Sequence, residues 1–207
     1  MENYFFLNGK KIELTEEQAR QIAESFTVKP SVRLGDVPVG QVVKLGEYEF
    51  VVLEHNGGTT QLIMKGILED DVKFGEVNND YRKSNVRKML DEFADKLASI
   101  VGGNNIIQHA VDLTSEDGLK DYGTLLIERV SLLTADKYRK FVDILDMHKP
   151  DVWWWLATPH STSRHENDEW VKCVSPRGNF NYDLYGLNFA VRPFCIFVSS
   201  ISVSYDE

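Results

Sequence analysis

Val152-Trp153-Trp154-Trp155-Leu156 is the stretch of this sequence that bears most directly on the fold. Three consecutive tryptophans between aliphatic residues place large apolar side chains on both faces of an extended strand, so we expect this strand to be buried on both sides. Further strands are expected at Trp170 to Val174, near Phe180 to Tyr182, and at Ala190 to Val198. The last third of the chain is therefore predicted to form strands around an aromatic core.

The residues before this region predict a mixture of strands and helices. Strands are expected at Gln41–Lys44, Tyr48–Glu54, Thr60–Met64 and Leu125–Val130. A helix capped by Ser84 should turn one apolar face inward, formed by Val86, Met89, Leu90, Phe93, Leu97 and Ile100. A second helix, capped by Thr134 and running to about Ile144, should bury Tyr138, Phe141 and Val142. Because strands and helices do not alternate regularly, the predicted fold class is α+β with mixed or antiparallel sheets.

A small unit is predicted ahead of this domain. Asn8-Gly9 favours a tight hairpin turn between two short strands, and Thr15 with Gln18 forms a capping box for a helix from Glu16 to Phe26. Such a ββα unit is too small to hold a core of its own. Since Lys29-Pro30-Ser31 is typical of a linker, we predict an appendage at residues 1–30 and the main domain at residues 35–207.

Composition excludes several classes of function. The chain has 207 residues, of which 43% are hydrophobic and 27% charged, as in an ordinary globular protein. Its formal net charge of -9 argues against a nucleic-acid partner, since phosphate binding depends on clustered Lys and Arg. No apolar run reaches the length of a membrane helix, and the first residues do not resemble a signal peptide. We therefore expect synthesis in the cytoplasm and no membrane insertion.

The common catalytic motifs are absent from the sequence. It has no Gly-rich phosphate loop, no His-Glu-x-x-His pair and no Gly-x-Ser-x-Gly elbow. Cys173 and Cys195 lie in apolar strand patterns, which favours buried thiols, either a free pair or a disulfide, over reactive nucleophiles. We therefore predict neither catalysis nor a cofactor.

The segment from His160 to Asp168 contains the residue types that bind metals. His160, His165, Glu166 and Asp168 could together hold zinc or a similar ion, and the oxygens of Glu166, Asn167 and Asp168 could hold calcium. Their spacing matches no specific metal motif, and a loop rich in Ser, His, Asn and Asp is ordinarily a solvated loop. The prediction is therefore no metal.

Two polar stretches on either side of the Trp170 to Val174 strand carry the functional prediction. Tyr offers a large contact area at a low entropic cost, and Asn, Ser and Asp offer adaptable hydrogen bonds, which is the chemistry of natural and engineered binding surfaces. A hydrophilic hairpin without a ligand is the alternative. The predicted ligand-binding residues are His160, Ser161, Ser163, Arg164, His165, Asn167, Asp168, Asn179, Asn181, Tyr182, Asp183, Tyr185 and Asn188.

The order of several motifs resembles a family of bacterial and phage domains of uncharacterised function. Their C-terminal signature, Trp-Trp-Leu-Arg-Ser-Pro-Gly followed by Gly-Val-Arg-Pro-Ala, is similar to Trp154-Trp155-Leu156-Ala157-Thr158-Pro159-His160 and to Phe189-Ala190-Val191-Arg192-Pro193-Phe194-Cys195. The likeness extends upstream over residues 35 to 200, through Tyr48 to Leu53, Asn79 to Leu90 and Leu132 to Tyr138. His160 stands in place of the family's Gly, and Ala157-Thr158 in place of Arg-Ser.

This resemblance implies a C-type-lectin-like fold, shared by formylglycine-generating enzymes and by the variable proteins of diversity-generating retroelements. In the latter, mutagenesis of adenines varies codons for Asn, Tyr, Asp, His and Ser on a surface that, in phage members, binds a host receptor. The resemblance thus implies a non-catalytic, phage-derived or prophage-derived display protein, associated with the virion, whose partner is a protein or cell-surface ligand. The reactive cysteine pair of the enzymes and the calcium motifs of sugar-binding lectins have no counterpart here, and fold alone does not imply function.

Two alternatives stay open at this stage. One is an enzyme on the same fold, with His160, His165 and Asp168 in a cleft. The other is a structural virion or assembly protein whose polar surface meets another subunit, for example in a homo-oligomer. Arg192, next to Pro193 at a strand start, is predicted to satisfy loop carbonyl groups or a carboxylate and not to contact a ligand.

Overall fold

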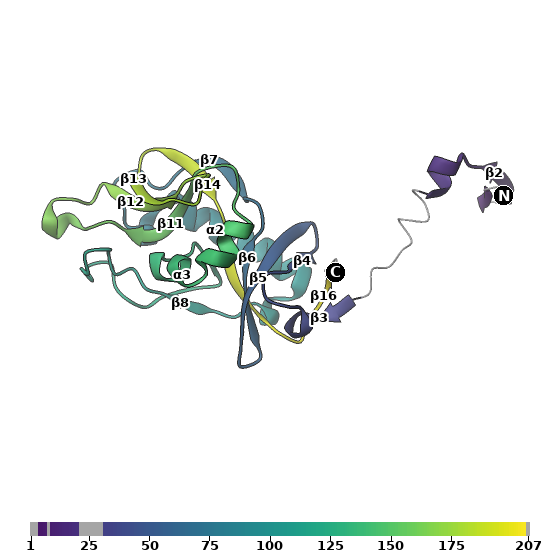
Figure 1. Cartoon of the computed structure of the whole chain (residues 1–207), viewed down its shortest axis with the longest axis horizontal. Helices are drawn as coiled ribbons and strands as arrows, with labels where there is room; N and C mark the ends of the chain where they lie inside the picture. The colour runs from purple at the N-terminus through teal and green to yellow at the C-terminus, as the bar shows by residue number, and fades with distance from the viewer. Residues whose placement is uncertain (1–3, 8, 21–30, 206–207) are drawn as a thin grey trace. The chain divides into compact units, whose positions relative to one another are not determined.

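The computed structural model describes residues 4–7, 9–20 and 31–205. The chain divides into two compact units, Met1–Ser31 and Val32–Glu207. In the first unit, β1 (Tyr4–Leu7) pairs antiparallel with β2 (Lys10–Glu13), which confirms the predicted hairpin (Figure 1). Gly9 has the positive φ, 78°, that such a turn favours, while Asn8 lies outside the described residues.

The predicted capping box is present at the start of the first helix. The Thr15 amide donates to Gln18 Oε1 at 3.0 Å, and the Gln18 amide donates to Thr15 Oγ1 at 3.2 Å. Residues 16–20 are helical, and the rest of the predicted helix lies outside the described residues. Ser31, the last residue of the predicted linker, is instead the first residue of strand β3 (Ser31–Arg33), and a 3-10 turn, η1 (Leu34–Asp36), follows that strand. The rest of the predicted linker lies outside the described residues.

The second unit is α+β and mostly antiparallel, built on two main sheets. The seven-stranded sheet has the order β10 (Val130–Ser131), β15 (Phe194–Val198), β6 (Thr59–Met64), β5 (Tyr48–Asn56), β4 (Val42–Leu45), β16 (Ser202–Tyr205) and β3. The five-stranded sheet has the order β13 (Phe180–Leu184), β12 (Trp170–Val174), β11 (Trp154–Pro159), β14 (Asn188–Val191) and β7 (Glu69–Lys73). A two-stranded ribbon joins β8 (His109–Val111) to β9 (Leu126–Glu128).

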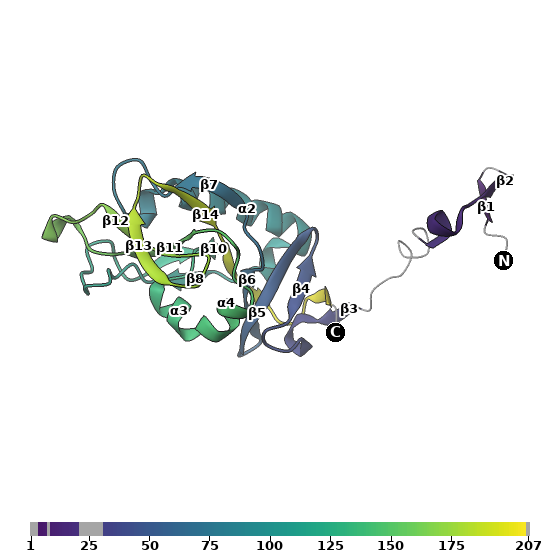
Figure 2. The ribbon, with the colours of Figure 1, turned by 45° about the horizontal axis from the view of Figure 1, so that its top comes forward.

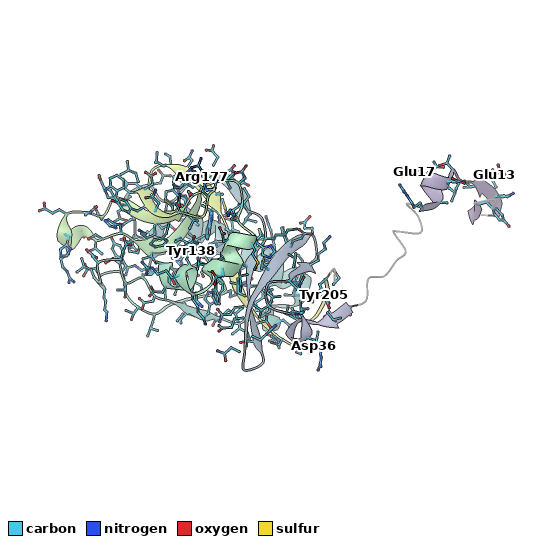
Figure 3. All side chains as sticks on the ribbon, viewed as in Figure 1. Glu13, Glu17, Asp36, Tyr138, Arg177 and Tyr205 are labelled. Atoms are coloured by element: carbon cyan, nitrogen blue, oxygen red, sulfur yellow. The ribbon has the colours of Figure 1, made fainter. Side chains whose placement is uncertain are left out.

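The tryptophan strand β11 lies at the centre of the five-stranded sheet and is buried on both faces, as the sequence predicts. Trp154 and Leu156 enter one hydrophobic cluster, together with Tyr138, which is buried and is labelled in Figure 3. Trp155 and Ala157 enter the other cluster. Because successive side chains of a strand point to opposite faces, the two apolar cores form on either side of the sheet. Trp153 lies just before the strand and is half-buried.

The predicted strand from Ala190 to Val198 is wrong as a single element. It is two strands in two different sheets, β14 and β15, separated by Arg192 and Pro193. Pro193 has no amide proton for a ladder, so a strand is readily interrupted there. Arg192 is fully buried at this crossing and donates to the carbonyl oxygens of Met64 at 2.8 Å and His148 at 2.9 Å. This confirms its predicted role.

Helix α2 (Asn85–Val101) begins where the sequence predicts. Ser84 Oγ accepts the Arg87 amide at 3.0 Å, and Gly102 ends the helix with a φ of 84°. Leu90 and Phe93 are buried as expected. Ile100 is wrong as a core residue because it is 43% exposed in the last turn, where it covers Gly46, and Met89 is only half-buried.

The second predicted helix is two short helices, α3 (Ala135–Lys140) and α4 (Val142–Met147) (Figure 2). Phe141, with φ −108° and ψ 15°, interrupts the helix while its side chain stays in the core. The interruption turns Val142 outward, so it is 40% exposed and the prediction for it is wrong. Thr134 does cap α3, accepting the Lys137 amide at 3.3 Å. Among the described residues, no helix is long and apolar enough to cross a membrane.

Candidate functional site

The segment from His160 to Asp168 forms a loop between β11 and β12, projecting beyond the ends of both strands (Figure 1). It contains a 3-10 turn, η4 (Ser163–His165), whose N-cap is Thr162. Glu166 ends the turn in the left-handed conformation, with a φ of 53°. Ser161 and Thr162 are buried, whereas Ser163, Arg164 and His165 are exposed. The loop is thus held at its base and open at its tip.

Three carboxylates from a distant acidic segment, Glu116, Asp117 and Asp121, hold this loop. Glu116 binds first to the end of β11, where its amide donates to the Pro159 carbonyl at 3.0 Å. Its carboxylate lies 2.8 Å from His160 Nδ1 and accepts from Lys172 Nζ at 3.0 Å. Lys172 is 3% exposed, so this ion pair satisfies a nearly buried ammonium group.

Asp117 and Asp121 bind the rest of the loop. Ser161 Oγ donates to Asp117 at 2.6 Å, and His165 Nδ1 lies 2.9 Å from the same carboxylate oxygen. Thr162 Oγ1 donates to Asp121 at 2.6 Å, and Arg164 forms an ion pair with Asp121. Hydrogen bonds in which one partner is charged are the stronger kind, and together they fix the loop on the acidic segment.

A buried amide anchors the loop from below. Asn79 donates through Nδ2 to the carbonyl oxygens of Ser161 at 3.0 Å and Trp170 at 2.8 Å. Its own Oδ1 accepts the Tyr122 hydroxyl at 2.8 Å, and its backbone amide donates to the Asp168 carbonyl at 2.9 Å. Asn79 therefore joins both ends of the loop to the start of β12.

Aromatic side chains surround Lys172 on one face of β12 and the edge strand β13. His160 stacks on Tyr182, with ring centroids 4.3 Å apart and planes 17° from parallel, and Trp170 meets Tyr182 edge-on at 5.6 Å. Lys172 lies over the rings of Tyr182 and Phe180, at 5.0 Å and 4.2 Å. Tyr182 nevertheless stays 42% exposed. The result is a firmly positioned aromatic surface beside the anchored loop.

The second polar stretch, Asn179 to Asn188, contains a strand followed by a turn, which confirms the strand predicted near Phe180 to Tyr182. Its first half is β13, paired with β12 in the register Lys172 to Tyr182, and Asn188 begins β14. Asn181 and Asp183 hydrogen-bond through Oδ1 to the next backbone amide. Tyr185 is half-buried against the core. β13 forms because it pairs with β12 and alternate side chains of this segment pack against that strand.

The structure thus brings one part of the predicted set together and separates the rest. His160 and Tyr182 are in contact, Ser161 and His165 share one carboxylate, and Arg164 binds another. Asn167 and Asp168 are half-buried in the loop, and Asn179 and Asn188 are exposed at the ends of the second stretch.

Sequence reasoning missed the acidic segment and Lys172. Glu116 is 44 residues from His160 along the chain, and Asp117 is 48 from His165. A Ser-Glu-Asp-Gly segment is also what an ordinary solvated turn looks like, so the sequence holds no signal that links it to the loop.

The surroundings of these carboxylates lower their pKa values. Burial alone raises the pKa of Glu116, but the hydrogen bonds from Lys172 and His160 outweigh it and bring that pKa below its ordinary value. For Asp117, burial is likewise outweighed by hydrogen bonds from Ser115, Ser161 and His165, so its pKa falls to about 2. Both groups are therefore anionic at neutral pH, which keeps the loop anchored.

The groups weighed for chemistry are dispersed or inaccessible. Cys173 and Cys195 are free and buried; burial raises the pKa of Cys173 to about 12 and that of Cys195 well above its ordinary value. Within the described ranges, no three His, Cys, Asp or Glu side chains gather as metal ligands. A pocket of about 230 Å³ lies between the acidic segment and the start of α3, and its lining includes Glu116 and Arg139 but neither His160 nor His165.

No family model, characterised protein or solved structure matches this chain in the comparisons with known proteins.

Proposed function

We propose that this chain is a non-catalytic ligand-binding protein with a C-type-lectin-like fold, and that its binding surface is the anchored loop together with the Tyr182 surface. The proposed contact residues are the exposed loop tip, Ser163, Arg164 and His165, and the neighbouring aromatic side chains of Tyr182 and Trp170. The ligand is a protein or another component of a cell surface, as for a display protein of phage or prophage origin diversified by a retroelement.

The observation that carries this proposal is the anchoring of the loop. A loop that orders only on binding pays an entropic cost that weakens affinity. Here Glu116, Asp117 and Asp121 hold the loop in one conformation before any ligand arrives. Its exposed tip is therefore presented on a rigid support, as in binding sites built for specificity.

The chemistry of the exposed groups also supports binding. Tyr and Trp are frequent among residues that dominate interface energies, and Arg forms directional pairs with carboxylates and phosphates. Tyr182 and Arg164 combine large exposed side chains with defined supports, His160 for the ring and Asp121 for the guanidinium. Catalysis has less support, because both thiols are buried and protonated.

Binding of the fluorescently labelled full chain to a panel of intact bacterial strains tests the proposal. For any strain that the chain binds, Tyr182→Ala and Arg164→Ala should each weaken binding roughly tenfold or more, as expected for central interface residues. Ile127→Ala, which truncates a 52% exposed side chain on β9, serves as the matched control and should leave binding unchanged.

Two results would contradict the proposal at different levels. If no strain in a broad panel is bound, recognition of a cell surface is wrong. If a strain is bound but Tyr182→Ala and Arg164→Ala bind like the control, the protein binds through another surface. Thermal unfolding of each variant, which should stay close to that of the wild type, separates loss of contact from loss of fold.

A further inference from the structure

The outer edge of the five-stranded sheet carries a feature that ligand binding does not explain. β13 is the last strand on that side, and within the described part of the chain no strand pairs with its outer edge. Tyr182 and Leu184 lie two residues apart on one face of this strand and are 42% and 37% exposed. An exposed edge strand with apolar side chains ordinarily attracts a strand from another molecule.

Alternation of the backbone shows which amides face outward. The Asn179 carbonyl accepts the Ser175 amide, and the Tyr185 amide donates to the Glu169 carbonyl, so these odd-numbered residues bond toward β12. In an antiparallel ladder, alternate residues point their amide and carbonyl groups to the same side. The backbone groups of Tyr182 and the amide of Leu184 therefore point away from the sheet, while the Leu184 carbonyl already accepts the Leu187 amide at 3.0 Å in the turn that follows.

Both outward amides end on a side chain of the preceding residue. The Tyr182 amide donates to Asn181 Oδ1 at 2.9 Å, and the Leu184 amide donates to Asp183 Oδ1 at 2.9 Å. On β7, at the opposite edge of the same sheet, the Asp71 amide also donates to the preceding side chain, Asp70 Oδ1, at 2.8 Å, but there the strand is irregular and Asp71 has a φ of 60°. A donor that is already bonded is a poor partner for an incoming strand.

We propose that Asn181 and Asp183 close the outer edge of β13, and that the strand this edge would otherwise accept is β13 of a second copy of the chain. Antiparallel pairing about Tyr182 is self-complementary: Tyr182 would face its own counterpart, and Phe180 would face Leu184. The same pairing would bring Asn181 opposite Asp183, whose oxygens already hold the amides needed for the new ladder. The inference is independent of the proposed ligand.

The decisive variant is the double replacement Asn181→Val with Asp183→Val, which removes both oxygens and favours a strand. We expect light scattering on a sizing column to give twice the mass of the wild-type species at high protein concentration. Adding Tyr182→Pro should restore the wild-type mass, because proline removes an outward amide without removing a bond to β12. Asp183→Asn alone, which removes the charge and keeps an oxygen acceptor, should keep the wild-type mass.

Amide hydrogen exchange provides a second readout that needs no new association. Asn181→Ala should speed exchange of the Tyr182 amide, and Asp183→Ala that of the Leu184 amide, each roughly five-fold, as expected for the loss of one hydrogen bond. The proposal is overturned if these amides exchange at the wild-type rate, or if the folded double-valine variant keeps the wild-type mass. Doubling by Asp183→Asn would assign the protection to charge and not to the capped amides.

Discussion

His109 should make this fold sensitive to mild acid. The imidazole is 9% exposed, lies 5.2 Å from the ring of Phe194, and is hydrogen-bonded through Nε2 to Ser131 Oγ at 2.9 Å. Lys137 Nζ also lies over the Phe194 ring, 4.6 Å from its centroid. Burial, and then the charge of Lys137, lower the pKa of His109 from its ordinary 6.5 to about 4.

The lowered pKa of His109 sets both the sign and the size of the change in stability with pH. Between pH 6.5 and pH 4 the unfolded chain binds a proton at His109 that the folded chain does not, so the free energy of unfolding falls as the pH falls. At about 1.4 kcal/mol per unit of pKa, the whole difference corresponds to about 3 kcal/mol. About 2 kcal/mol of this should be lost between about pH 7 and about pH 4.5.

Urea unfolding of the wild type and of His109→Gln at these two pH values measures the effect. The variant should be less stable at neutral pH, because it alters a packed site, but its free energy of unfolding should fall by about 2 kcal/mol less on acidification. His55→Gln, at the exposed end of β5, controls for the loss of a histidine as such. Equal losses for the wild type and His109→Gln would refute a neutral, buried imidazole.

Three further outcomes are expected. Trp154→Ala should cost about 3–5 kcal/mol in urea unfolding, since it empties a core site that is 1% exposed; a loss below about 1 kcal/mol would contradict its place in the core. Asp117, with its pKa of about 2 against an ordinary 3.8, contributes stability above pH 3.8 that is lost as the pH falls toward 2, so Asp117→Asn should flatten the acid limb of a stability-against-pH curve in that window. Cys173 and Cys195 should not react with a thiol reagent at neutral pH until the chain unfolds, and rapid labelling of the native protein would show that they are accessible.

Local elements were predictable where a short stretch contains all the residues that form them. Ser84 and Thr134 cap their helices, and the tryptophan run forms a strand with a core on each face, because caps and side-chain alternation depend on neighbours in sequence. Errors arose where packing competes with periodicity. Val142 has helical spacing, yet the interruption at Phe141 turns it outward.

The candidate site was predictable only in part. The loop from His160 to Asp168 could be located, since it is a polar stretch between two strand patterns. Whether the loop has a fixed conformation depends on Glu116, Asp117 and Asp121, which are more than 40 residues away along the chain. Asn181 and Asp183 are of the residue types that bind ligands. Their side-chain oxygens instead accept the backbone amides of the next residues, which side-chain type alone does not reveal.

The sequence by itself determined that this chain is α+β, that Trp154 and Trp155 lie in a strand buried on both faces, and that polar residues collect on either side of β12. Only the tertiary structure decided that Glu116, Asp117 and Asp121 meet the loop, and that one apolar stretch crosses between two sheets at Arg192. The reason is physical: capping and alternation act over a few residues, whereas ion pairs and sheet partners join segments whose separation along the chain has no signature in composition.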